Sequence, residues 1–441
     1  MSFQDMISNI ERIGENIFLS SRDGSMTFTQ FRNQVDLLKG YMYKTITDEN
    51  ITIGICIRSK SICSEVYIAA IEMGHDAAII GFDVNQNELD QYVGSVPVSL
   101  VVCSRYDRDI PRFECDILYI EEMVLNTCTA IDFISRDIYG DTLVQTSGTS
   151  GKRKVVRLSV DNLLSSANSW GSAIELSAED TYVHALDLST VGGVAILWRS
   201  LLHGFAIYMT DSKLADFKKI NSGNVIVSLV PTMLFDIIKD KGPGYFKGID
   251  LIVLGGEPIG SRQVELISGL NINIFMAYGM TETSSGVMGR WIAPMSEDEY
   301  IPFRDVSAMV VSGRIYLHGP MISTHLVPGS ISSNYLLTDD SGSIGPLGIR
   351  ITGRSDRTII SGGKKINPLD IERKILEIVG VESVSVYPED DDRWGQIVVA
   401  SVVTHKKSGI DRELIDSHCR ESLSAYKLPK KYYIKTIKEE N

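Results

Sequence analysis

The first two thirds of the chain alternate short apolar runs with longer amphipathic segments, and this alternation strongly limits the folds that are open to it. The apolar runs have the length and composition of buried strands, and they lie at 51–57, 76–82, 99–103, 225–230, 251–254 and 272–277. Helical segments are predicted at 62–73, 159–175 and 191–202, with Ser159 placed to cap the second. Strands that alternate with helices of this length imply crossover connections, so the sequence predicts an α/β fold with mixed or parallel sheets flanked by helices.

The last part of the chain has a different pattern of apolar and turn-forming residues. Turn-rich stretches follow residue 313, and two helices and two strands are then predicted, at 370–379, 411–424, 381–387 and 396–403. This order predicts a large N-terminal domain over 1–353, followed in the chain by a small α+β domain over 354–441. A chain of 441 residues is long enough for this division.

The formal net charge is −13, and the acidity belongs to the first 353 residues, because the remainder carries 16 Lys and Arg against 15 Asp and Glu. Such a balance argues against a protein that coats nucleic acid or binds anionic membranes. No apolar run approaches the roughly 18 residues of a spanning helix, and the N-terminus lacks the pattern of a secretory signal. The six scattered cysteines contain no CxxC pair and are typical of reduced thiols, so we expect a cytoplasmic protein.

The sharpest local feature is the stretch TSGTSGKRK at 146–154, which follows an apolar run. Its glycines and hydroxyl residues supply backbone N–H and side-chain donors, and its lysines add positive charge, as a polyphosphate requires. It is not a Walker A loop, because Thr146 and Arg153 stand where that motif has Gly and Ser or Thr. On composition alone, a phosphate site and an ordinary surface loop are equal alternatives.

Three further clusters have the composition of a nucleotide site. AYGMTET at 277–283 places an aromatic ring, a glycine and a carboxylate after a buried strand, where ligands of open α/β sheets collect, and Glu282 could hold Mg²⁺. A helix that starts with Thr281 as its cap is the alternative. GGE at 255–257 has the same ambiguity. TDDSG at 338–342 and GRSD at 353–356 would supply an acid for two ribose hydroxyls and an arginine beside it, although Asp-rich turns are common.

Taken together and in this order, these segments resemble the adenylate-forming superfamily of acyl- and aryl-CoA ligases, nonribosomal adenylation domains and luciferases. TSGTSGKRK resembles its phosphate loop, YGMTE its adenine and Mg²⁺ motif, and TDDSG its ribose motif. The stretch at 353–372 resembles its hinge and the start of its mobile C-terminal domain. The resemblance runs from about Met26 to the end, and SLVPTML at 228–234 is most similar to small aryl-acid ligases of the o-succinylbenzoyl-CoA synthetase type.

The resemblance implies a two-step reaction that uses ATP, Mg²⁺ and either CoA or phosphopantetheine. A carboxylate first displaces pyrophosphate from ATP to give an acyl-AMP, and a thiol then displaces AMP. The implied phosphate contacts are Thr146, Ser147, Gly148, Thr149, Ser150, Gly151 and Lys154. The implied adenine site is Gly256, Glu257, Pro258, Tyr278 and Gly279, with Asp340 and Arg354 on the ribose. Thr281 would contact the α-phosphate and Glu282 the Mg²⁺, Asp356 would be the hinge, and Thr190, Gly362 and Gly363 would line the thiol channel.

Some positions depart from the family pattern. Thr190 stands where an aromatic–His pair normally gates the acid and thiol passages, which implies a differently shaped acid pocket. Lys364 and Lys365 replace a frequent Glu-Asn and add positive charge near the expected thiol route. The family's C-terminal lysine follows a glycine, whereas neither Lys435 nor Lys438 does, so that lysine is expected to be missing.

Three functional hypotheses follow. The first is an ATP-dependent ligase that joins a small aryl or acyl carboxylate to CoA. The second keeps the fold but transfers the acyl group to the phosphopantetheine of an acyl carrier protein in a biosynthetic pathway. The lysines of the small domain would suit an acidic carrier and the phosphates of CoA equally. The third is a degenerate homologue with impaired adenylation that binds nucleotide or carrier.

Overall fold

The structure is a computed structural model of the chain. It describes residues 3–437 except for gaps at 22–23, 82–95, 97, 109, 126–137, 147–153, 211–222, 257–258, 260, 293–297, 324, 326–330, 333–334, 355–358, 362–363, 392–393 and 406–408.

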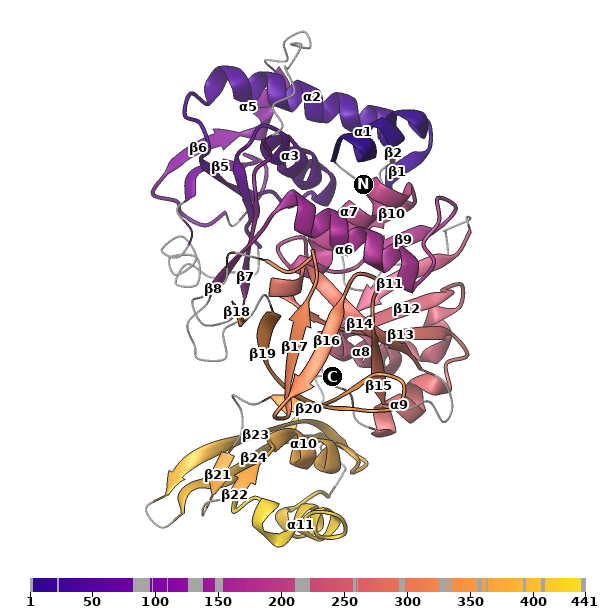
Figure 1. The fold of residues 1–441 in the computed structure, drawn as a ribbon, viewed down its shortest axis with the longest axis vertical. Helices are drawn as coiled ribbons and strands as arrows, with labels where there is room; N and C mark the ends of the chain where they lie inside the picture. The colour runs from indigo at the N-terminus through magenta and orange to yellow at the C-terminus, as the bar shows by residue number, and fades with distance from the viewer. Residues whose placement is uncertain are drawn as a thin grey trace.

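A large mixed sheet forms the middle of the molecule (Figure 1). Its strand order is β16-β17-β19-β20-β15-β14-β13-β12-β11-β9-β10-β1-β2, and β18 pairs with β19. Neighbouring strands are parallel from β1 through β10, β9, β11 and β12 to β13, and antiparallel from β13 to β16. The strands are β1 Ile17–Ser20, β2 Ser25–Thr27, β9 Thr181–His184, β10 Ala206–Met209, β11 Val225–Leu229, β12 Leu251–Gly255, β13 Asn273–Met280, β14 Ser285–Trp291, β15 Glu299–Pro302, β16 Ser307–Val311, β17 Arg314–His318, β18 Ile331–Ser332, β19 Tyr335–Ile344 and β20 Ile349–Arg354.

A second sheet is formed by strands from residues 52–158, in the order β6-β5-β3-β4-β7-β8. Its strands are parallel except for the β7–β8 hairpin. Strand β3 is buried along its whole length, which explains why its sequence is almost continuously apolar. The strands are β3 Thr52–Cys56, β4 Asp76–Ile79, β5 Val98–Cys103, β6 Asp116–Tyr119, β7 Thr142–Thr146 and β8 Lys154–Leu158.

Helices α6 and α7 lie between the two sheets (Figure 1). Ser159 caps α6 as predicted: its Oγ accepts from the Asn162 N–H at 3.2 Å, and the Asn162 side chain accepts from the Ser159 N–H at 3.1 Å. The helices of this part are α1 Phe3–Arg12, α2 Phe28–Thr45, α3 Lys60–Glu72, α5 Ile120–Leu125, α6 Val160–Ala173, α7 Val191–His203, α8 Pro231–Lys241 and α9 Ser261–Ser268, with 3₁₀ turns η2 Pro243–Phe246 and η3 Thr281–Thr283.

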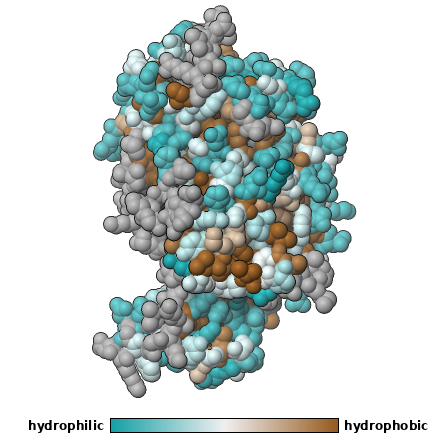
Figure 2. Space-filling model, in the orientation of Figure 1, coloured by the Kyte–Doolittle hydropathy of each residue, from teal (hydrophilic) through white to brown (hydrophobic). Residues whose placement is uncertain are grey.

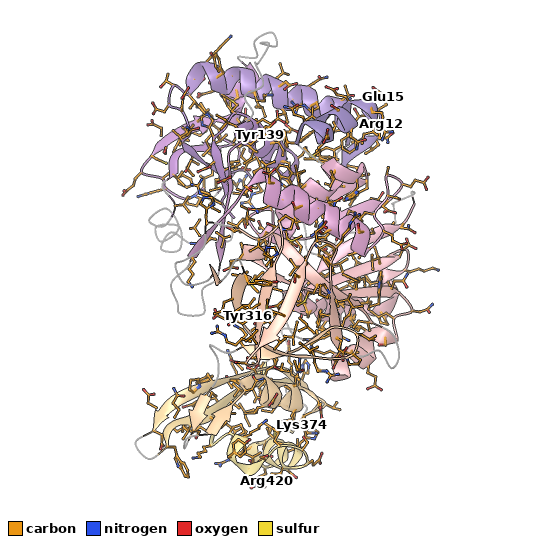
Figure 3. The ribbon with its side chains drawn as sticks, viewed as in Figure 1. Arg12, Glu15, Tyr139, Tyr316, Lys374 and Arg420 are labelled. Atoms are coloured by element: carbon orange, nitrogen blue, oxygen red, sulfur yellow. The ribbon has the colours of Figure 1, made fainter. Side chains whose placement is uncertain are left out.

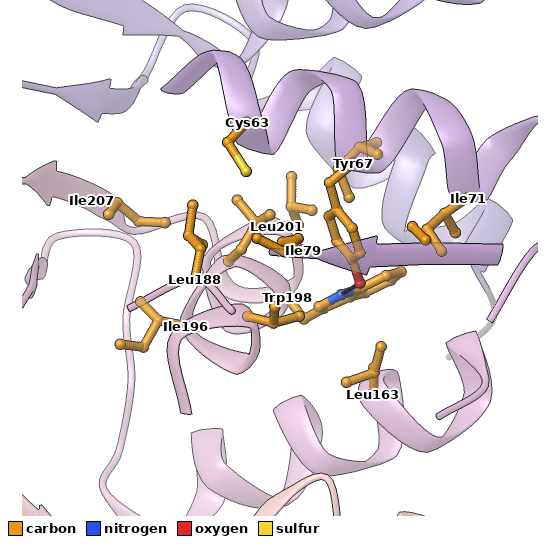
Figure 4. Packing of buried hydrophobic residues seen from close by; sticks show 14 of the residues in the cluster. Cys63, Tyr67, Ile71, Ile79, Leu163, Leu188, Ile196, Trp198, Leu201 and Ile207 are labelled. Carbon is orange, nitrogen blue, oxygen red and sulfur yellow. Dashed lines mark hydrogen bonds between the residues drawn. The ribbon is translucent and has the colours of Figure 1, made fainter. Parts of the chain in front are cut away.

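The layer between the sheets is closely packed around Trp198 of α7 (Figure 4). Its indole N–H donates to the Tyr67 hydroxyl at 2.9 Å, and that hydroxyl lies 2.6 Å from Thr142 Oγ1. Tyr67 and Trp198 are both fully buried, so these bonds satisfy polar atoms that water cannot reach. The two sheets thereby share one continuous core.

The small domain, residues 359–437, has a separate five-stranded sheet with the order β22-β21-β24-β23, in which β25 pairs with β24. Lys374 and Arg420 mark its two helices in Figure 3. Its buried apolar side chains form a separate core, and every described member of that core lies within residues 359–428. The elements are β21 Ile359–Ser361, β22 Lys364–Ile366, β23 Val381–Asp391, β24 Gly395–His405, β25 Lys431–Ile437, α10 Pro368–Leu376, α11 Arg412–Arg420 and the 3₁₀ turn η4 Ala425–Lys427.

The predicted fold class, a large α/β domain followed by a small α+β domain, is confirmed. Each predicted helix and strand has a counterpart whose ends differ by a few residues. The alternative of a helix that starts at Thr281 is wrong, because β13 continues to Met280 and only a 3₁₀ turn follows. Within the described part of the chain, no helix combines the length and apolarity needed to cross a membrane.

Candidate functional site

Two adjacent parallel strands bring the first pieces of the site together. Gly255 at the end of β12 lies opposite Ala277 of β13, so Gly256 and Tyr278 follow side by side at the carboxyl edge of the sheet. Gly256 has a φ of +87°, a left-handed conformation that favours glycine. Gly279 meets a different constraint, because a Cβ there would lie 2.1 Å from the Ser285 carbonyl oxygen.

Tyr278, Asp340 and Arg354 form a connected set. The Tyr278 hydroxyl donates to Asp340 Oδ2 at 2.7 Å, and Arg354 Nη1 lies 3.6 Å from Asp340 Oδ1. Asp340 and Arg354 face each other across β19 and β20, which explains how residues far apart in the chain come into contact. Burial, together with the neighbouring Asp340 charge, raises the pKa of Tyr278 well above its ordinary value, so the phenol stays a hydrogen-bond donor.

This set lines a cavity of about 500 Å³ between the two domains, a suitable size for a nucleotide-sized ligand. Gly256, Tyr278 and Gly279 contribute from the large sheet, and Asn367 and Arg373 contribute from the start of the small domain. Asn367 also caps α10, since its Oδ1 accepts from the Leu369 N–H at 3.0 Å. The small domain therefore forms one wall of the cavity.

Four arginines line the cavity, and their partners differ. Arg290 pairs with Asp298 at 3.0 Å, Arg350 with Glu299 at 3.2 Å, and Arg354 with Asp339 and Asp340. Arg373 of α10 is the exception, because among the described residues it has no carboxylate partner and its Nε is buried without a hydrogen bond. The cavity therefore has a cation on its small-domain side that no carboxylate of the described residues neutralises.

The 3₁₀ turn η3 carries Thr281 and Glu282 and lies beside β8. Ser323 joins the two elements: its N–H donates to the Glu282 carbonyl at 2.9 Å, and its Oγ donates to the Arg157 carbonyl of β8 at 2.6 Å. Lys154 begins β8 and faces Thr146 of β7 across the hairpin. The strand β8, which begins where the predicted phosphate loop ends, is thus held next to the turn that carries Thr281 and Glu282.

Glu282 has the properties of a magnesium ligand. It is partly exposed, and within the described chain its carboxylate forms no ion pair or hydrogen bond. Mg²⁺ prefers oxygen ligands and commonly takes one or two carboxylates together with phosphate oxygens. A carboxylate that has no partner among the described residues, on a turn beside β8, fits that requirement.

Thr190 lies at the start of α7, on the connection that follows β9. Its Oγ1 accepts from the Gly193 N–H at 3.2 Å and donates to the Asp187 carbonyl at 2.7 Å, so it caps the helix. The same connection is anchored by Lys60, whose Nζ donates to the carbonyls of His184 and Leu186 at 3.0 Å each. Thr190 is thus held in a rigid segment.

His184 stays neutral in that segment. Complete burial, followed by the nearby Lys60 charge, lowers the pKa of His184 to about 4. Its Nε2 lies 3.0 Å from the Gly193 carbonyl, which requires the proton on Nε2 and leaves Nδ1 to face Lys60 at 3.4 Å. Neither Lys60 nor His184 was predicted as a site residue, because Lys60 lies just before the predicted helix 62–73 and His184 lies in a segment for which no element was predicted.

Several predicted site residues lie outside the described residues: Ser147, Gly148, Thr149, Ser150, Gly151, Glu257, Pro258, Asp356, Gly362 and Gly363. Their roles stay predictions. Sequence reasoning also missed the cavity residues Arg290, Arg350, Asn367 and Arg373, because their positions in the chain carry no motif by which a cavity could be recognised.

Comparison with known proteins gives consistent matches over most of the chain. A profile of the AMP-binding enzyme family matches residues 9–314, and one of the AMP-binding enzyme C-terminal domain matches residues 370–439. A 2-succinylbenzoate–CoA ligase of Bacillus cereus is 28% identical, over 84% of this chain and 86% of the relative. One from Oceanobacillus iheyensis is 26% identical, over 84% and 82%.

Solved structures show the same fold. The o-succinylbenzoate coenzyme A synthetase (MenE) of Bacillus subtilis, in complex with ATP and a magnesium ion, matches with a TM-score of 0.85 and 20% identity, over 97% of this chain and 95% of that one. ATP-bound MatB of Rhodopseudomonas palustris matches with a TM-score of 0.86 and 18% identity, over 97% and 94%. The arrangement of a large and a small domain is therefore common to these proteins.

Proposed function

Because the chain belongs to the AMP-binding enzyme family, and is thus an adenylate-forming ligase, we propose that it activates a small aryl carboxylate with ATP and transfers it to CoA. The observation that carries this proposal is the cavity in which Tyr278, Asp340 and Arg354 are already connected. An aromatic ring and a buried carboxylate offer a base and a ribose the contacts that they need.

In the first step, a carboxylate oxygen of the acid attacks the α-phosphorus of ATP. The bond from that phosphorus to the oxygen bridging to the β-phosphate breaks, and pyrophosphate leaves with its electron pair. In the second step, a thiolate attacks the acyl carbonyl carbon, AMP leaves as the phosphate monoester, and the thiol proton passes to solvent. No protein atom forms a covalent bond, so catalysis depends on positioning and on charge stabilisation.

We assign the residues accordingly. Tyr278 stacks on the adenine, which Gly256 and Gly279 allow to approach the backbone, and Asp340 with Arg354 holds the ribose. Thr281 contacts the α-phosphate, while Lys154, Thr146 and the loop at 147–151 hold the β- and γ-phosphates. Glu282 holds Mg²⁺, which when bound offsets the negative charge of the phosphates. Asp356 is the proposed hinge, and Thr190, Gly362 and Gly363 line the proposed thiol passage.

The acid and the acceptor are proposed from the relatives. The relatives from Bacillus cereus and Oceanobacillus iheyensis carry the name 2-succinylbenzoate–CoA ligase. The first acid to test is therefore 2-succinylbenzoate, and the first thiol is CoA. Both carrier transfer and a degenerate role lack such support. Since ATP and CoA are intracellular metabolites, we place the reaction in the cytoplasm.

The proposal is tested by the release of pyrophosphate from ATP and Mg²⁺ across a panel of carboxylic acids that includes 2-succinylbenzoate, benzoate and malonate. We expect release that depends on an aryl acid, and a mass that corresponds to the acyl-CoA when CoA is added. Glu282→Gln and Lys154→Ala should each reduce the rate of pyrophosphate release by roughly 100-fold.

Exposed residues of the same type provide matched controls. Glu11→Gln and Lys247→Ala remove the same charges at exposed positions that do not line the cavity, and they should leave the rate within about twofold. Wild-type protein that binds ATP yet releases no pyrophosphate with any acid would contradict the ligase and favour the degenerate homologue.

A further inference from the structure

The turn that follows Glu282 has an unusual backbone. Ser284 and Ser285 have φ angles of +53° and +97°, a left-handed region in which residues with a Cβ are uncommon. Two such residues in succession store conformational strain, and strain of this kind gathers at functional sites. We refer to Ser284 and Ser285 as the left-handed turn. Its position, directly after Thr281 and Glu282, makes the residues that hold it relevant to the site.

Hydrogen bonds from α6 and to the 319–323 segment hold the left-handed turn. Ser166 Oγ of α6 donates to the Ser284 carbonyl at 2.7 Å, and Ser284 Oγ donates to the Met321 carbonyl at 2.7 Å. Thr283 Oγ1 accepts from the Met280 N–H at 3.0 Å and lies 2.6 Å from the Ser285 carbonyl. Ser166, Thr283 and Ser284 are all at most 1% exposed, so water cannot replace any of these bonds.

Arg199 of α7 also holds the turn. Its Nη2 donates to Ser285 Oγ at 3.0 Å, and its guanidinium lies 4.0 Å from the Trp170 ring. Arg199 is 2% exposed, and no carboxylate pairs with it in the described part of the molecule. Its Nε is buried without a hydrogen-bond partner. Burial of a charge costs free energy that hydrogen bonds must offset, and Ser285 of the turn supplies one such bond.

We propose that Ser166 and Arg199 are positioning residues that fix the left-handed turn and thereby aim the Glu282 carboxylate at Mg²⁺. This inference rests on the proposed function, since it assumes that Glu282 is the magnesium ligand. No hydrogen bond orients the Glu282 carboxylate itself within the described chain, so its direction is set by the backbone of η3 and of the turn. Loosening the turn would let that carboxylate sample other directions and weaken magnesium binding.

Helix α6 offers a matched pair of variants for the test. Ser166 and Ser169 are both 1% exposed and both donate to a carbonyl, Ser166 to Ser284 at 2.7 Å and Ser169 to Arg304 at 2.8 Å. Ser166→Ala and Ser169→Ala should therefore lower the melting temperature by similar amounts. In contrast, Ser166→Ala alone should raise the Mg²⁺ concentration for half-maximal pyrophosphate release, by about tenfold, because of the two serines only Ser166 bonds to the left-handed turn.

A second readout does not depend on turnover. Mn²⁺ can replace Mg²⁺ as a paramagnetic probe, and its binding to protein with a non-hydrolysable ATP analogue can be followed by electron paramagnetic resonance. Ser166→Ala and Ser285→Ala, which removes the acceptor of Arg199, should each weaken Mn²⁺ binding about tenfold, whereas Ser169→Ala should stay within about twofold of wild type. Ser285→Ala provides the answer if Ser166→Ala does not fold.

The outcomes separate the two proposals. Equal Mn²⁺ affinities in Ser166→Ala, Ser285→Ala and Ser169→Ala would overturn the positioning role, even if the wild-type protein is an active ligase. A wild-type protein that releases no pyrophosphate would contradict the proposed function, and the Mn²⁺ titration would still decide whether the turn controls the metal site.

Discussion

Asp339 and Asp340 are adjacent acids whose surroundings differ greatly. The Asp340 side chain is 11% exposed and accepts from Tyr278, whereas that of Asp339 is 53% exposed and lies between Arg314 and Arg354 at 3.5 and 3.7 Å. A hydrogen bond to a buried carboxylate is stronger than one in water, because the effective dielectric constant is lower. Of the two, Asp340 is therefore the residue that would bind the ribose.

Asp340→Asn should raise the dissociation constant of ATP by about tenfold, because a hydrogen bond to a charged acceptor contributes about 1.5 kcal/mol or more. Asp339→Asn, the matched control, should change it by less than about twofold, as for an exposed ion pair. Isothermal titration with a non-hydrolysable ATP analogue measures both constants. Equal losses in the two variants would contradict the ribose assignment.

The sequence predicted Asp340 and Arg354 as partners but not how they meet. Their pairing depends on the register of β19 and β20, and a distant residue holds the turn between these strands. Glu299 accepts from the N–H groups of Leu347 and Gly348 at 2.8 and 3.1 Å. The sequence around these strands does not indicate that Glu299 binds their turn. A motif can therefore identify the residues of a site without predicting the strand register that brings them together.

The connection from β9 to α7 shows how a buried histidine adds pH dependence to an element. Unfolded, His184 would bind a proton near pH 6.5, whereas in the folded chain it does so only near pH 4. As the pH falls through this window, the unfolded chain takes up a proton that the folded chain does not, so His184 lowers the free energy of unfolding. Glu65 on α3 opposes it, because burial raises the pKa of Glu65 to about 7.

The His184→Gln variant separates the contribution of His184 to the pH dependence of unfolding from that of Glu65. His184→Gln keeps a side-chain N–H for the Gly193 carbonyl but cannot take up a proton. Between pH 7 and pH 4, wild type should lose about 3 kcal/mol of unfolding free energy relative to this variant. Denaturant unfolding at a series of pH values measures the difference. If the free energy of unfolding depends on pH in the same way in both proteins, the pKa of His184 is the same in the folded and unfolded chain, and the prediction is wrong.

Helix α10 supplies Arg373, the cavity arginine that pairs with no carboxylate among the described residues. Arg373→Ala should raise the KM for ATP roughly fivefold with kcat little changed, since the interaction is made by the bound nucleotide in both ground and transition states. Arg373→Lys should recover part of the loss. Lys374, the next residue on the helix, pairs with Glu377 at 2.8 Å, so Lys374→Ala is the matched control and should leave KM unaltered. A change in kcat alone for Arg373→Ala would contradict a binding role.

The elements themselves were largely predictable because their signals are local. Ser159 and the apolar spacing after it predict α6, and the continuous apolar run at 51–57 predicts the buried β3. What stayed hidden is the association of elements: α10 was expected as a helix, but nothing in its sequence indicates that Arg373 faces a cavity lined by Tyr278. Such contacts depend on the docking of two domains, which periodicity does not encode.

At the scale of the whole molecule, the two domains meet at a narrow junction (Figure 2). The contacts there include Asn367, which donates to the Thr352 carbonyl, and the exposed ion pair of Lys239 with Glu382 at 3.3 Å. Each domain has its own apolar core, so each has the means to unfold as a separate unit. A ligand in the cavity between them would couple these units, because it would contact both.

Calorimetry should therefore show two transitions for the free protein, and a saturating non-hydrolysable ATP analogue should raise both. At about 100 times the dissociation constant, a ligand stabilises what it binds by about 2.7 kcal/mol, and even half of that would raise the small domain's melting temperature by about 5 °C. In Arg373→Ala, the small domain loses its charged contact with the nucleotide, so its transition should rise less while that of the large domain still rises. If the small domain's transition in wild type does not move, the nucleotide binds to the large domain alone, and the wall formed by α10 has no part in binding it.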